Sequence, residues 1–505
     1  MLRSAHHGHV LAVLTAMRRL GFPKLVATRR SRERDLAVAL VAARILEPRS
    51  KLATHRWWDR TTLPETLNLE GATEDDLYGA MDWLLSHQRA IERKLAGRHL
   101  AEGGFALCDL TSSYFEGRCC PLAARGHNRD GKRGKLQVNY CLLTDRQGRP
   151  ISVTVYPGNT NDPKTLLPQV QKLRQAFGIQ NVAVVGDRGM ISQRQINALR
   201  ELPGMDWITA LRSEAIRKLL QDNPLQMRLF DERNLFEMHH PDYPGERLVA
   251  CRNPELARLR AHKRQSLLDA TTRELDKVRG MVARRRLKGK DAIGVRVGKV
   301  VNKYKVAKHF HLDIRDRVFD FYVKEAQVEA EASLDGIYMV RTSLPRKHLD
   351  AAETVRSYKS LSDVERAFRS FKTVDLKVRP IYHWTEDRVR AHIFLCMLAY
   401  YVEWHMIEAW RPLLFCDEDQ MAKKTRDPVA PAKRSEAALR KVHTKRLDDG
   451  SAVHSFQTLL QGLSSIVRNV CRTSPADEAA PTFTVDTQQT HQQQRAYDLL
   501  EGINL

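Results

Sequence analysis

The sequence predicts an α/β (α+β) protein with a mixed β-sheet flanked by helices, interrupted by an inserted domain and preceded by a helical N-terminal domain. Three observations support this prediction. The first hundred residues have helical periodicity, apolar alternation typical of strands begins at residue 105, and a basic stretch from residue 212 breaks that pattern before it resumes. At 505 residues the chain is too long for one simple core, so several domains are expected.

The N-terminal region, residues 1–100, is predicted to be helical. The apolar run Leu36–Leu46 has helical periodicity and is stopped by Pro48. A second helix is expected over residues 74–94, with its core face formed by Leu77, Met81, Leu84 and Leu85. Two interpretations remain open for this region, a helical cap on the next domain or a separate domain that binds DNA ends.

Strand patterns dominate from residue 105 onward. Three successive strands are expected over 105–110, 136–143 and 151–156, and the turn at Asp145–Pro150 joins the second and third as a hairpin. A helix over 163–177, a buried strand over 181–187, a helix from Ser192 and a strand over 207–211 follow. Three antiparallel strands followed by β/α units is the order of a ribonuclease-H-like sheet.

The stretch 212–331 interrupts this order and is predicted to be an inserted domain. It contains a long charged helix over about 254–286 and a β-rich patch over 309–323. The near-heptad residues of the helix are consistent with packing inside the domain or with pairing in a dimer, and they are Leu268, Leu275, Val278 and Val282.

The sheet pattern resumes over 332–410, so the main domain is assigned to residues 101–211 and 332–410. This part supplies a strand over 336–341, a helix around Glu365 and a helical stretch over 388–410. Residues 411–505 are expected to form a linker and a partly disordered tail, because 423–445 is rich in Pro, Ala, Lys and Arg and 472–497 carries Gln runs.

The charge of the chain points to a polyanionic partner. The net charge is +23, and the segment Arg252–Lys308 holds 18 Lys/Arg against five Asp/Glu, a net charge of +13. Nucleic acid is the first candidate, bound mainly through its phosphates. The run Arg284, Arg285 and Arg286 is the densest cationic group of this segment.

The sequence offers no membrane or disulfide signal. The apolar run Ile393–Val402 is about half the length of a membrane span, and no N-terminal stretch has the form of a targeting segment. Eight cysteines without a C-x-x-C pair indicate thiols in a reducing compartment. We therefore expect a cytoplasmic protein that has no membrane partner.

Three acids stand where the fold would bring them together. Asp109 lies in or at the end of the first strand, Asp187 ends the apolar strand 181–187, and Glu365 lies on the late helix. A carboxylate at the end of a buried strand is costly unless it is paired or bound to a metal, and two on adjacent strands repel each other. Oxygen-only ligation suits Mg²⁺ or Mn²⁺. Two such ions would support phosphodiester cleavage and strand transfer without a covalent enzyme intermediate.

Glu365 is also the centre of a seven-residue pattern, Tyr358–Glu365–Lys372. Seven residues is close to two helical turns, so the three side chains would form one column. An apolar stripe beside this column would place it at the border of the core, and its members are Leu361, Val364, Phe368 and Phe371.

With these motifs, over about residues 37–404, the chain resembles a bacterial insertion-sequence transposase of the DDE superfamily, in the group related to insertion sequence four. The segments that carry the resemblance surround Asp109 and Asp187, and include 137–150, Tyr156–Asp162, the Tyr358/Glu365/Lys372 signature and Arg379–Trp384.

The resemblance implies that Asp109, Asp187 and Glu365 form a catalytic triad that binds two Mg²⁺ ions, for which Mn²⁺ could substitute. An insertion domain between Asp187 and Glu365 is implied as well. It also implies that Tyr358 and Lys372 contact DNA near the cleaved end. The expected partners are double-stranded DNA, as element ends and target, and a second copy of the chain in a synaptic complex. The expected location is the bacterial nucleoid.

One departure from the family pattern is plain. The family signature has arginine three residues after the tyrosine, and here that position is Leu361. Arg366 or Arg369 could substitute for the phosphate contact of that arginine. The capping residue is open between Ser360 and Ser362, with Tyr358 on the entering turn.

Several other residues carry two readings. Asn159 and Asp162 are predicted turn formers, with Asp162 also able to support the acidic site from outside. Arg188 is expected to pair with a carboxylate, and His383 and Trp384 would pack in the core or abut the DNA end.

The function predicted is therefore a DNA transposase that binds terminal inverted repeats, cleaves DNA with metal ions and joins the ends to a target. A catalytically idle regulator that binds DNA and a related metal-dependent nuclease without strand transfer are the alternatives. Hairpin and hydrolytic cleavage of the second strand both remain open.

Overall fold

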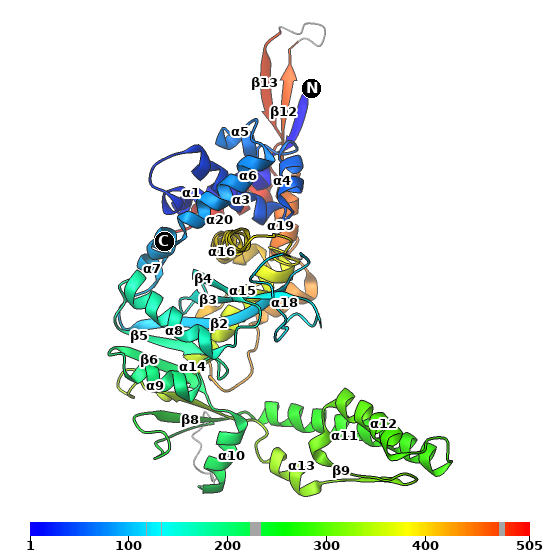
Figure 1. The fold of residues 1–505 in the computed structure, drawn as a ribbon. Helices are drawn as coiled ribbons and strands as arrows, with labels where there is room; N and C mark the ends of the chain where they lie inside the picture. Colours follow the sequence, from blue (N-terminus) through cyan, green and yellow to red (C-terminus); the bar gives the residue numbers. More distant parts are fainter. Residues whose placement is uncertain (118, 133, 223–233, 474–479, 505) are drawn as a thin grey trace. The chain divides into compact units, whose positions relative to one another are not determined.

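A computed structural model describes residues 1–117, 119–132, 134–222, 234–473 and 480–504 (Figure 1). The chain divides into two compact units. Unit 1 comprises Met1–Thr209, Arg356–Arg426 and Ala432–Leu505, and unit 2 comprises Ala210–Val355 and Asp427–Pro431.

The strands of unit 1 form a mixed sheet in the order β4-β3-β2-β5-β6. The pairs β2–β3 and β3–β4 are antiparallel, whereas β5 is parallel to both β2 and β6. The ribonuclease-H-like fold predicted from the sequence is therefore confirmed. The strand bounds are β2 Gly104–Tyr114, β3 Gln137–Thr144, β4 Pro150–Pro157, β5 Val182–Gly186 and β6 Met205–Ala210.

Burial explains why these segments read as they do in the sequence. All eight residues of β3 and all five of β5 are buried. A strand covered on both faces has no polar alternation, which is why the stretch before Asp187 is a continuous apolar run. In the register of the sheet, Cys108 on β2 pairs with Gly186 on β5. Asp109 and Asp187 are the next residues along these two strands, so the register brings them side by side.

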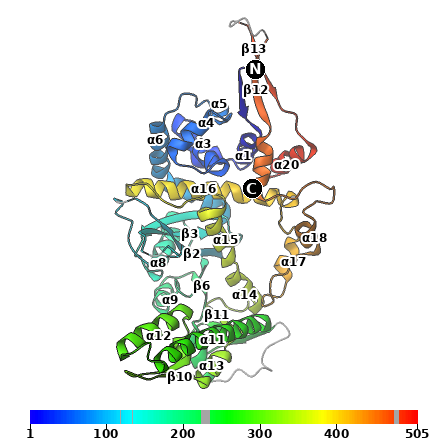
Figure 2. The same ribbon diagram turned by 90° about the vertical axis from the view of Figure 1, so that its right-hand side faces the viewer.

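Helices cover this sheet, and one of them is central to unit 1. The helix α16 (Glu386–Ala409) packs against α3, α6 and β4, and Figure 2 shows it between the N-terminal helices and the strands. No helix among the described residues is both long enough and apolar enough to cross a bilayer. The N-terminal helices are α1 Gly8–Arg19, α2 Phe22–Val26, α3 Arg32–Leu46, α4 Lys51–Trp58, α5 Leu63–Leu67, α6 Glu74–Ser86 and α7 Gln88–His99.

The helix expected over 74–94 is two helices, α6 and α7, which meet at His87. The His87 ring stacks on Trp83 at 4.0 Å between ring centroids, and its Nδ1 lies 2.8 Å from the Trp83 carbonyl oxygen. The side chain thus binds a carbonyl oxygen in the last turn of α6, where carbonyls have no amide partner within the helix. Periodicity alone does not reveal such a break.

The signature region is also divided, into α14 (Ala351–Lys359), α15 (Leu361–Arg369) and the π-helical turn η4 (Ser370–Val374). Ser360 is the N-cap residue of α15, although its side chain bonds back to the Ser357 carbonyl at 2.6 Å and caps no amide. Tyr358, Glu365 and Lys372 therefore lie on three successive segments. The expected single column is wrong because α14 ends before α15 begins.

The remaining helical elements of unit 1 connect and flank the sheet. Two short helices follow the hairpin, and several more complete the C-terminal part. Their bounds are α8 Pro163–Gln171, η1 Lys172–Ala176, α9 Gln193–Arg200, η5 Arg411–Leu413, α17 Gln420–Thr425, α18 Glu436–Thr444, α19 Phe456–Ser464 and α20 His491–Glu501.

The C-terminal region contains more structure than the sequence composition suggested. Strands β12 (Val467–Arg472) and β13 (Thr482–Asp486) pair with each other, and β12 also pairs with β1 (Arg3–His6). Of the stretch predicted to be partly disordered, residues 474–479 and 505 lie outside the described residues. The helix α20 packs on α1, and its buried residues are Ala496, Tyr497 and Leu500. The Gln run at the start of α20 therefore belongs to a helix with an apolar face.

Unit 2 has a three-stranded antiparallel sheet and a helical pair with its own core. The sheet has the order β11-β8-β7. The helices α11 and α12 pack together, and buried Leu268, Leu275, Val278 and Val282 of α11 share one cluster with Ile293, Val297 and Val301 of α12. Packing inside the unit therefore accounts for the heptad-like spacing. The bounds are α10 Ser213–Asp222, β7 Leu235–Met238, β8 Arg247–Arg252, α11 Pro254–Ala283, α12 Lys290–Tyr304, η3 Ala307–His309, β9 Phe310–Ile314, β10 Phe319–Val323, α13 Glu325–Ala332 and β11 Ile337–Thr342.

Gly158, which follows β4, offers a test of the fold. A β-carbon at this position would lie 2.0 Å from the Gln137 carbonyl oxygen and 2.6 Å from that of Ala124. Because backbone atoms form these contacts, Gly158→Ala must displace the loop, and we expect a loss of about 1–3 kcal/mol and a lower melting temperature. Gly97→Ala in α7 is the matched control, since nothing lies within 4 Å of its β-carbon and alanine favours helix. Equal melting temperatures for the two variants would contradict this prediction.

Candidate active site

Asp109 lies within β2, between buried Cys108 and Leu110. Its Oδ1 accepts a hydrogen bond from the Leu110 amide at 2.8 Å. Burial raises the pKa of this carboxyl to about 7, and the negative charges of Asp187 and Glu365 contribute to the same rise. The three predicted acids are thus electrostatically coupled in the folded chain.

Asp187 follows the last residue of β5. Its Oδ1 accepts hydrogen bonds from the amides of Gly189 at 3.0 Å and Met190 at 2.7 Å, which fix the turn after the strand. Gly186 permits this turn, because a β-carbon there would lie 3.0 Å from the Ile191 side chain. The strand end and the turn together position the second carboxylate beside β2.

Glu365 is brought to the sheet by the apolar face of α15. The predicted stripe is buried throughout, with Leu361 at 9%, Val364 at 0%, Phe368 at 6% and Phe371 at 0% exposure. Phe368 packs edge-on against Tyr140 of β3, with 5.9 Å between ring centroids. With this face against β2 and β3, Glu365 remains on the exposed side of the helix.

The three carboxylates form a donor set that suits a hard divalent cation. As the side chains stand, the described residues include no group of three His, Cys, Asp or Glu gathered tightly enough to hold an ion. The Oδ2 atoms of Asp109 and Asp187 accept no hydrogen bond from any described residue, so both are available as ligands. Burial, followed by the charges of Asp187 and Glu365, disfavours the ionised form of Asp109, and a cation bound there would favour that form.

Tyr358 lies near this acidic group although it is on α14. Burial raises the pKa of its hydroxyl to about 12, and the charges of Asp187, Glu365 and Asp109 add to the rise. The side chain is half-buried. The break after Lys359 therefore does not remove Tyr358 from the site.

Lys372 has a different environment from the one expected. It is 9% exposed, and its Nζ donates to Asp130 Oδ1 at 3.0 Å. Arg379 forms a second ion pair with the same carboxylate, and the Tyr114 amide donates to Asp130 Oδ2 at 3.0 Å. A phosphate contact by Lys372 would require this buried network to open.

The family of the chain follows from comparison with known proteins. The model of the transposase DDE domain matches residues 109–402, more than half of the chain. The chain belongs to the transposase DDE family. The matched range begins at Asp109 and includes Asp187 and Glu365.

Two further comparisons complete the picture of the DDE domain's relatives. No curated protein matches the chain. One solved structure with a likeness to it is a cryo-EM structure of the piggyBac transposase synaptic complex with hairpin DNA. It has 9% sequence identity and a TM-score of 0.38, over 90% of this chain and 77% of that chain.

The remaining candidate residues near the acids differ in their exposure and in their partners. Arg366 is exposed and pairs with Asp363 at 3.1 Å, whereas Arg369 is exposed on the same helix. Arg188 is exposed and close enough to Tyr358 to oppose the rise in its pKa. Leu361, at the position of the family arginine, is part of the core.

The loop between β2 and β3 contributes residues that the sequence reading missed. Arg129 pairs with Asp162, the residue before α8, and Asp130 holds Lys372 and Arg379. In the sequence, Arg129 and Asp130 stand between polar residues and Gly131, which reads as an ordinary turn. Only the partners, which lie 33 and 242 positions away, distinguish them.

The residues Tyr382, His383 and Trp384, which precede α16, differ in burial. Trp384 is 70% exposed and Tyr382 is 63% exposed, so neither belongs to the core. His383 packs against Tyr78 and His392, and burial lowers its pKa to about 3. Of the two readings offered for His383 and Trp384, core packing therefore applies to the histidine.

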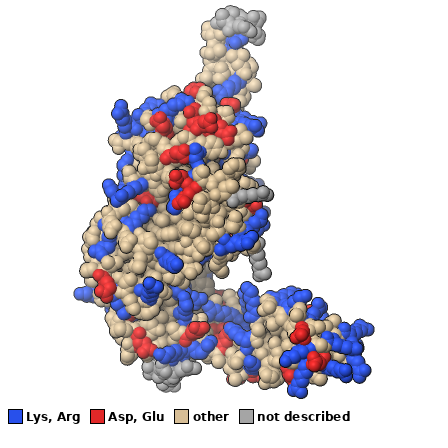
Figure 3. Space-filling view, in the orientation of Figure 1, with Lys and Arg blue, Asp and Glu red and all other residues tan. Residues whose placement is uncertain are grey.

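In unit 2, Arg284, Arg285 and Arg286 are exposed at the end of α11. Figure 3 shows Lys and Arg side chains gathered over the helical pair α11 and α12. Between these helices lies a pocket of about 250 Å³ whose cationic lining residues are Lys277, Arg296, Lys299 and Lys303. This surface has the charge that a phosphate backbone would meet.

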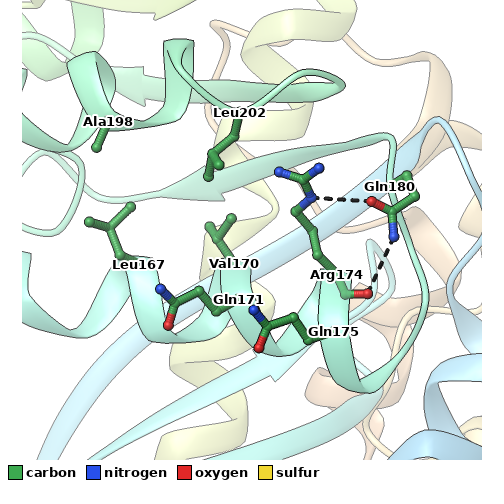
Figure 4. A pocket seen from close by; sticks show the side chains of 8 residues that line it. All are labelled: Leu167, Val170, Gln171, Arg174, Gln175, Gln180, Ala198 and Leu202. Carbon is green, nitrogen blue, oxygen red and sulfur yellow. Dashed lines mark hydrogen bonds between the residues drawn. The ribbon is translucent and has the colours of Figure 1, made fainter.

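A larger cavity, of about 500 Å³, lies between α8 and α9, and its lining combines apolar side chains such as Leu167, Val170 and Leu202 with three glutamines and Arg174 (Figure 4). At one end, Arg174 Nε donates to Gln180 Oε1 at 3.2 Å. None of the three acids lines this cavity. Its size therefore does not make it the catalytic site.

The network around Asp130 gives a test of how the signature segment is held. Asp130→Asn would leave Lys372 and Arg379 without a full counter-charge in a buried place, and we expect a loss of about 3–5 kcal/mol. Thermal unfolding of the variant measures this loss. Glu116→Gln removes the partner of Lys135 in an exposed pair and should change stability by less than about 1 kcal/mol. A variant Asp130→Asn as stable as Glu116→Gln would show that the network does not hold η4.

Proposed function

We propose that this protein is an insertion-sequence transposase that binds the terminal inverted repeats of its element, cleaves the DNA there and joins the 3′ ends to target DNA. The observation that carries the proposal is the coupling of Asp109, Asp187 and Glu365, which come from two adjacent strands and one helix of a ribonuclease-H-like domain. The group related to insertion sequence four is part of the same proposal, on the motifs found in the sequence.

The three acids would hold two Mg²⁺ ions, or Mn²⁺ in their place. When bound, the ions would lower the pKa of the attacking water and stabilise the leaving oxygen. The chain's own part is to hold Asp109 within β2 and Asp187 directly after β5, and to keep Glu365 open to solvent. In the joining step the 3′-hydroxyl would take the place of water.

DNA contacts are proposed for two groups of residues. Tyr358, Arg366 and Arg369 would contact the end near the scissile bond, with Lys372 contributing if its ion pair opens. Arg284, Arg285 and Arg286 would contact the phosphate backbone and position the duplex without reading bases. Two copies of the chain would be needed to hold both element ends in one synaptic complex.

Substitution of the acids tests the chemistry. Asp109→Ala, Asp187→Ala and Glu365→Ala should each lower Mg²⁺-dependent nicking of an element-end duplex by at least about 1,000-fold, because each removes a metal ligand. Binding of the end should persist, since removal of a negative charge does not repel DNA. Gel analysis of nicking and fluorescence anisotropy of binding measure the two quantities.

Glu201→Ala, at an exposed position after α9, is the control for that experiment and should nick at the wild-type rate. Substantial nicking by any of the three acid variants would remove the assignment. If wild-type protein nicks but never joins the ends to a target plasmid, the protein is a nuclease without strand transfer.

The basic segment has its own test. Replacing Arg284, Arg285 and Arg286 with alanine should weaken end binding and reduce the slope of log affinity against log salt by up to about three, since each phosphate contact contributes about 0.9. Titrations between 50 and 200 mM salt, roughly the range over which such contacts are lost, measure the slope. The exposed residues Lys433, Arg434 and Arg440 give a control of equal charge. An unchanged slope in the first variant would exclude these arginines from the interface.

A further inference from the structure

Arg129, in the loop between β2 and β3, is bound at one end of its guanidinium. Its Nη2 lies 2.6 Å from both Oδ1 and Oδ2 of Asp162. Both side chains are partly buried, with 21% and 30% exposure. The Arg129 amide also donates to Ser112 Oγ at 3.1 Å, which ties the loop to β2. The guanidinium therefore has a fixed position.

That position adjoins the acidic group. An Asp162 oxygen and both oxygens of Asp187 lie within 3.5 Å of one point, the place a β-carbon on Gly189 would occupy. The charge of Arg129 also acts on Asp109, where it opposes the rise in pKa. Arg129 is thus a neighbour of two of the three catalytic acids without being hydrogen-bonded to either.

The rest of the guanidinium remains available. A guanidinium has five N–H donors, and those on Nη2 are directed to Asp162. The donors on Nη1 and Nε have no acceptor among the described residues. An arginine held on one edge by a carboxylate, with its other edge free beside an acidic metal site, has the geometry for binding a phosphate oxygen.

The signature of this chain lacks a cation for that task. Leu361 replaces the expected arginine and is buried. Two nearby substitutes are engaged elsewhere, since Lys372 is bonded to Asp130 and Arg366 pairs with Asp363. Arg369 is exposed on α15, and no carboxylate among the described residues fixes its direction. Arg188 is exposed and has no carboxylate that fixes its direction among the described residues. Arg129 is the cation whose orientation the fold sets.

We propose that Arg129 binds the scissile phosphate through its Nη1 and Nε donors, and that Asp162 is the positioning residue that aims it. The inference rests on the proposed function. In the cleavage step a water oxygen bonds to phosphorus and the bond to the 3′ oxygen breaks, which leaves a 3′-hydroxyl and a 5′-phosphate. Arg129 gives up no proton. It donates hydrogen bonds to a non-bridging oxygen whose negative charge grows in the transition state.

The first experiment measures nicking by full-length variants on an element-end duplex with Mg²⁺. Arg129→Gln should lower the rate about 100-fold, in the range found when one transition-state donor is removed. Arg129→Lys should retain part of the rate, because it keeps the charge and loses the forked geometry. Arg125→Gln, an exposed residue of the same loop, is the control and should match wild type.

The second experiment separates a phosphate contact from a structural role. End binding is measured with Ca²⁺ replacing Mg²⁺, on DNA with a natural scissile phosphate and on DNA with an uncharged methylphosphonate there. Wild-type protein should prefer the natural phosphate, and Arg129→Gln should lose about tenfold or more of that preference. Asp162→Asn should lose a smaller part, because the cation stays but is no longer aimed. Such coupling between a residue and one substrate atom does not arise from a general loss of fold.

The outcomes distinguish this inference from the function on which it rests. Wild-type protein that neither nicks nor binds an element end would remove the proposed function itself. If wild type nicks, and Arg129→Gln nicks at the same rate or keeps the full preference for the natural phosphate, Arg129 does not bind that phosphate. Equal preference in Asp162→Asn and wild type would remove the role of Asp162 alone.

Discussion

The burial of a carboxylate in the sheet, beside two other acids, is the constraint on which the rest of this structure depends. Asp109 stands between residues that are almost wholly buried, and Asp187 follows a strand with no exposed residue. Burial raises the pKa of Asp109 to about 7, and the charges of Asp187 and Glu365 add to the rise. Burying a charged carboxylate is unfavourable for folding. Carboxylates with perturbed pKa values on rigid elements are typical of catalytic sites.

The cations of the chain fall into two kinds, which differ in their partners. Near the acids, cations are held by carboxylates of the loops, as Arg129 is by Asp162 and Lys372 by Asp130. These pairs are partly or wholly buried, so they fix positions. Farther along the chain, the arginines at the end of α11 are exposed and make no comparable pairs in the described structure. Exposed cations of this kind add long-range attraction for a polyanion, which salt screens.

Local sequence predicted much of the fold because the signals were local. The apolar stripe of α15 has helical spacing, and all four of its members are buried. The continuous run before Asp187 is a parallel strand covered on both faces. Predictions were wrong where an expected continuous helix is interrupted, as at His87 between α6 and α7 and at Ser360 between α14 and α15. Polar composition likewise concealed the apolar face of α20.

The sequence by itself determined which chemistry the protein can carry. Three acids with strand and helix contexts, a cationic segment and the matched family motifs are all read from residue identity and spacing. The tertiary structure decided which groups meet. It placed Lys372 in a buried ion pair with Asp130 and brought Arg129, held by Asp162, to the acids. These contacts join residues tens to hundreds of positions apart, and no local preference encodes a partner at that separation, because it is chain folding that brings the two together.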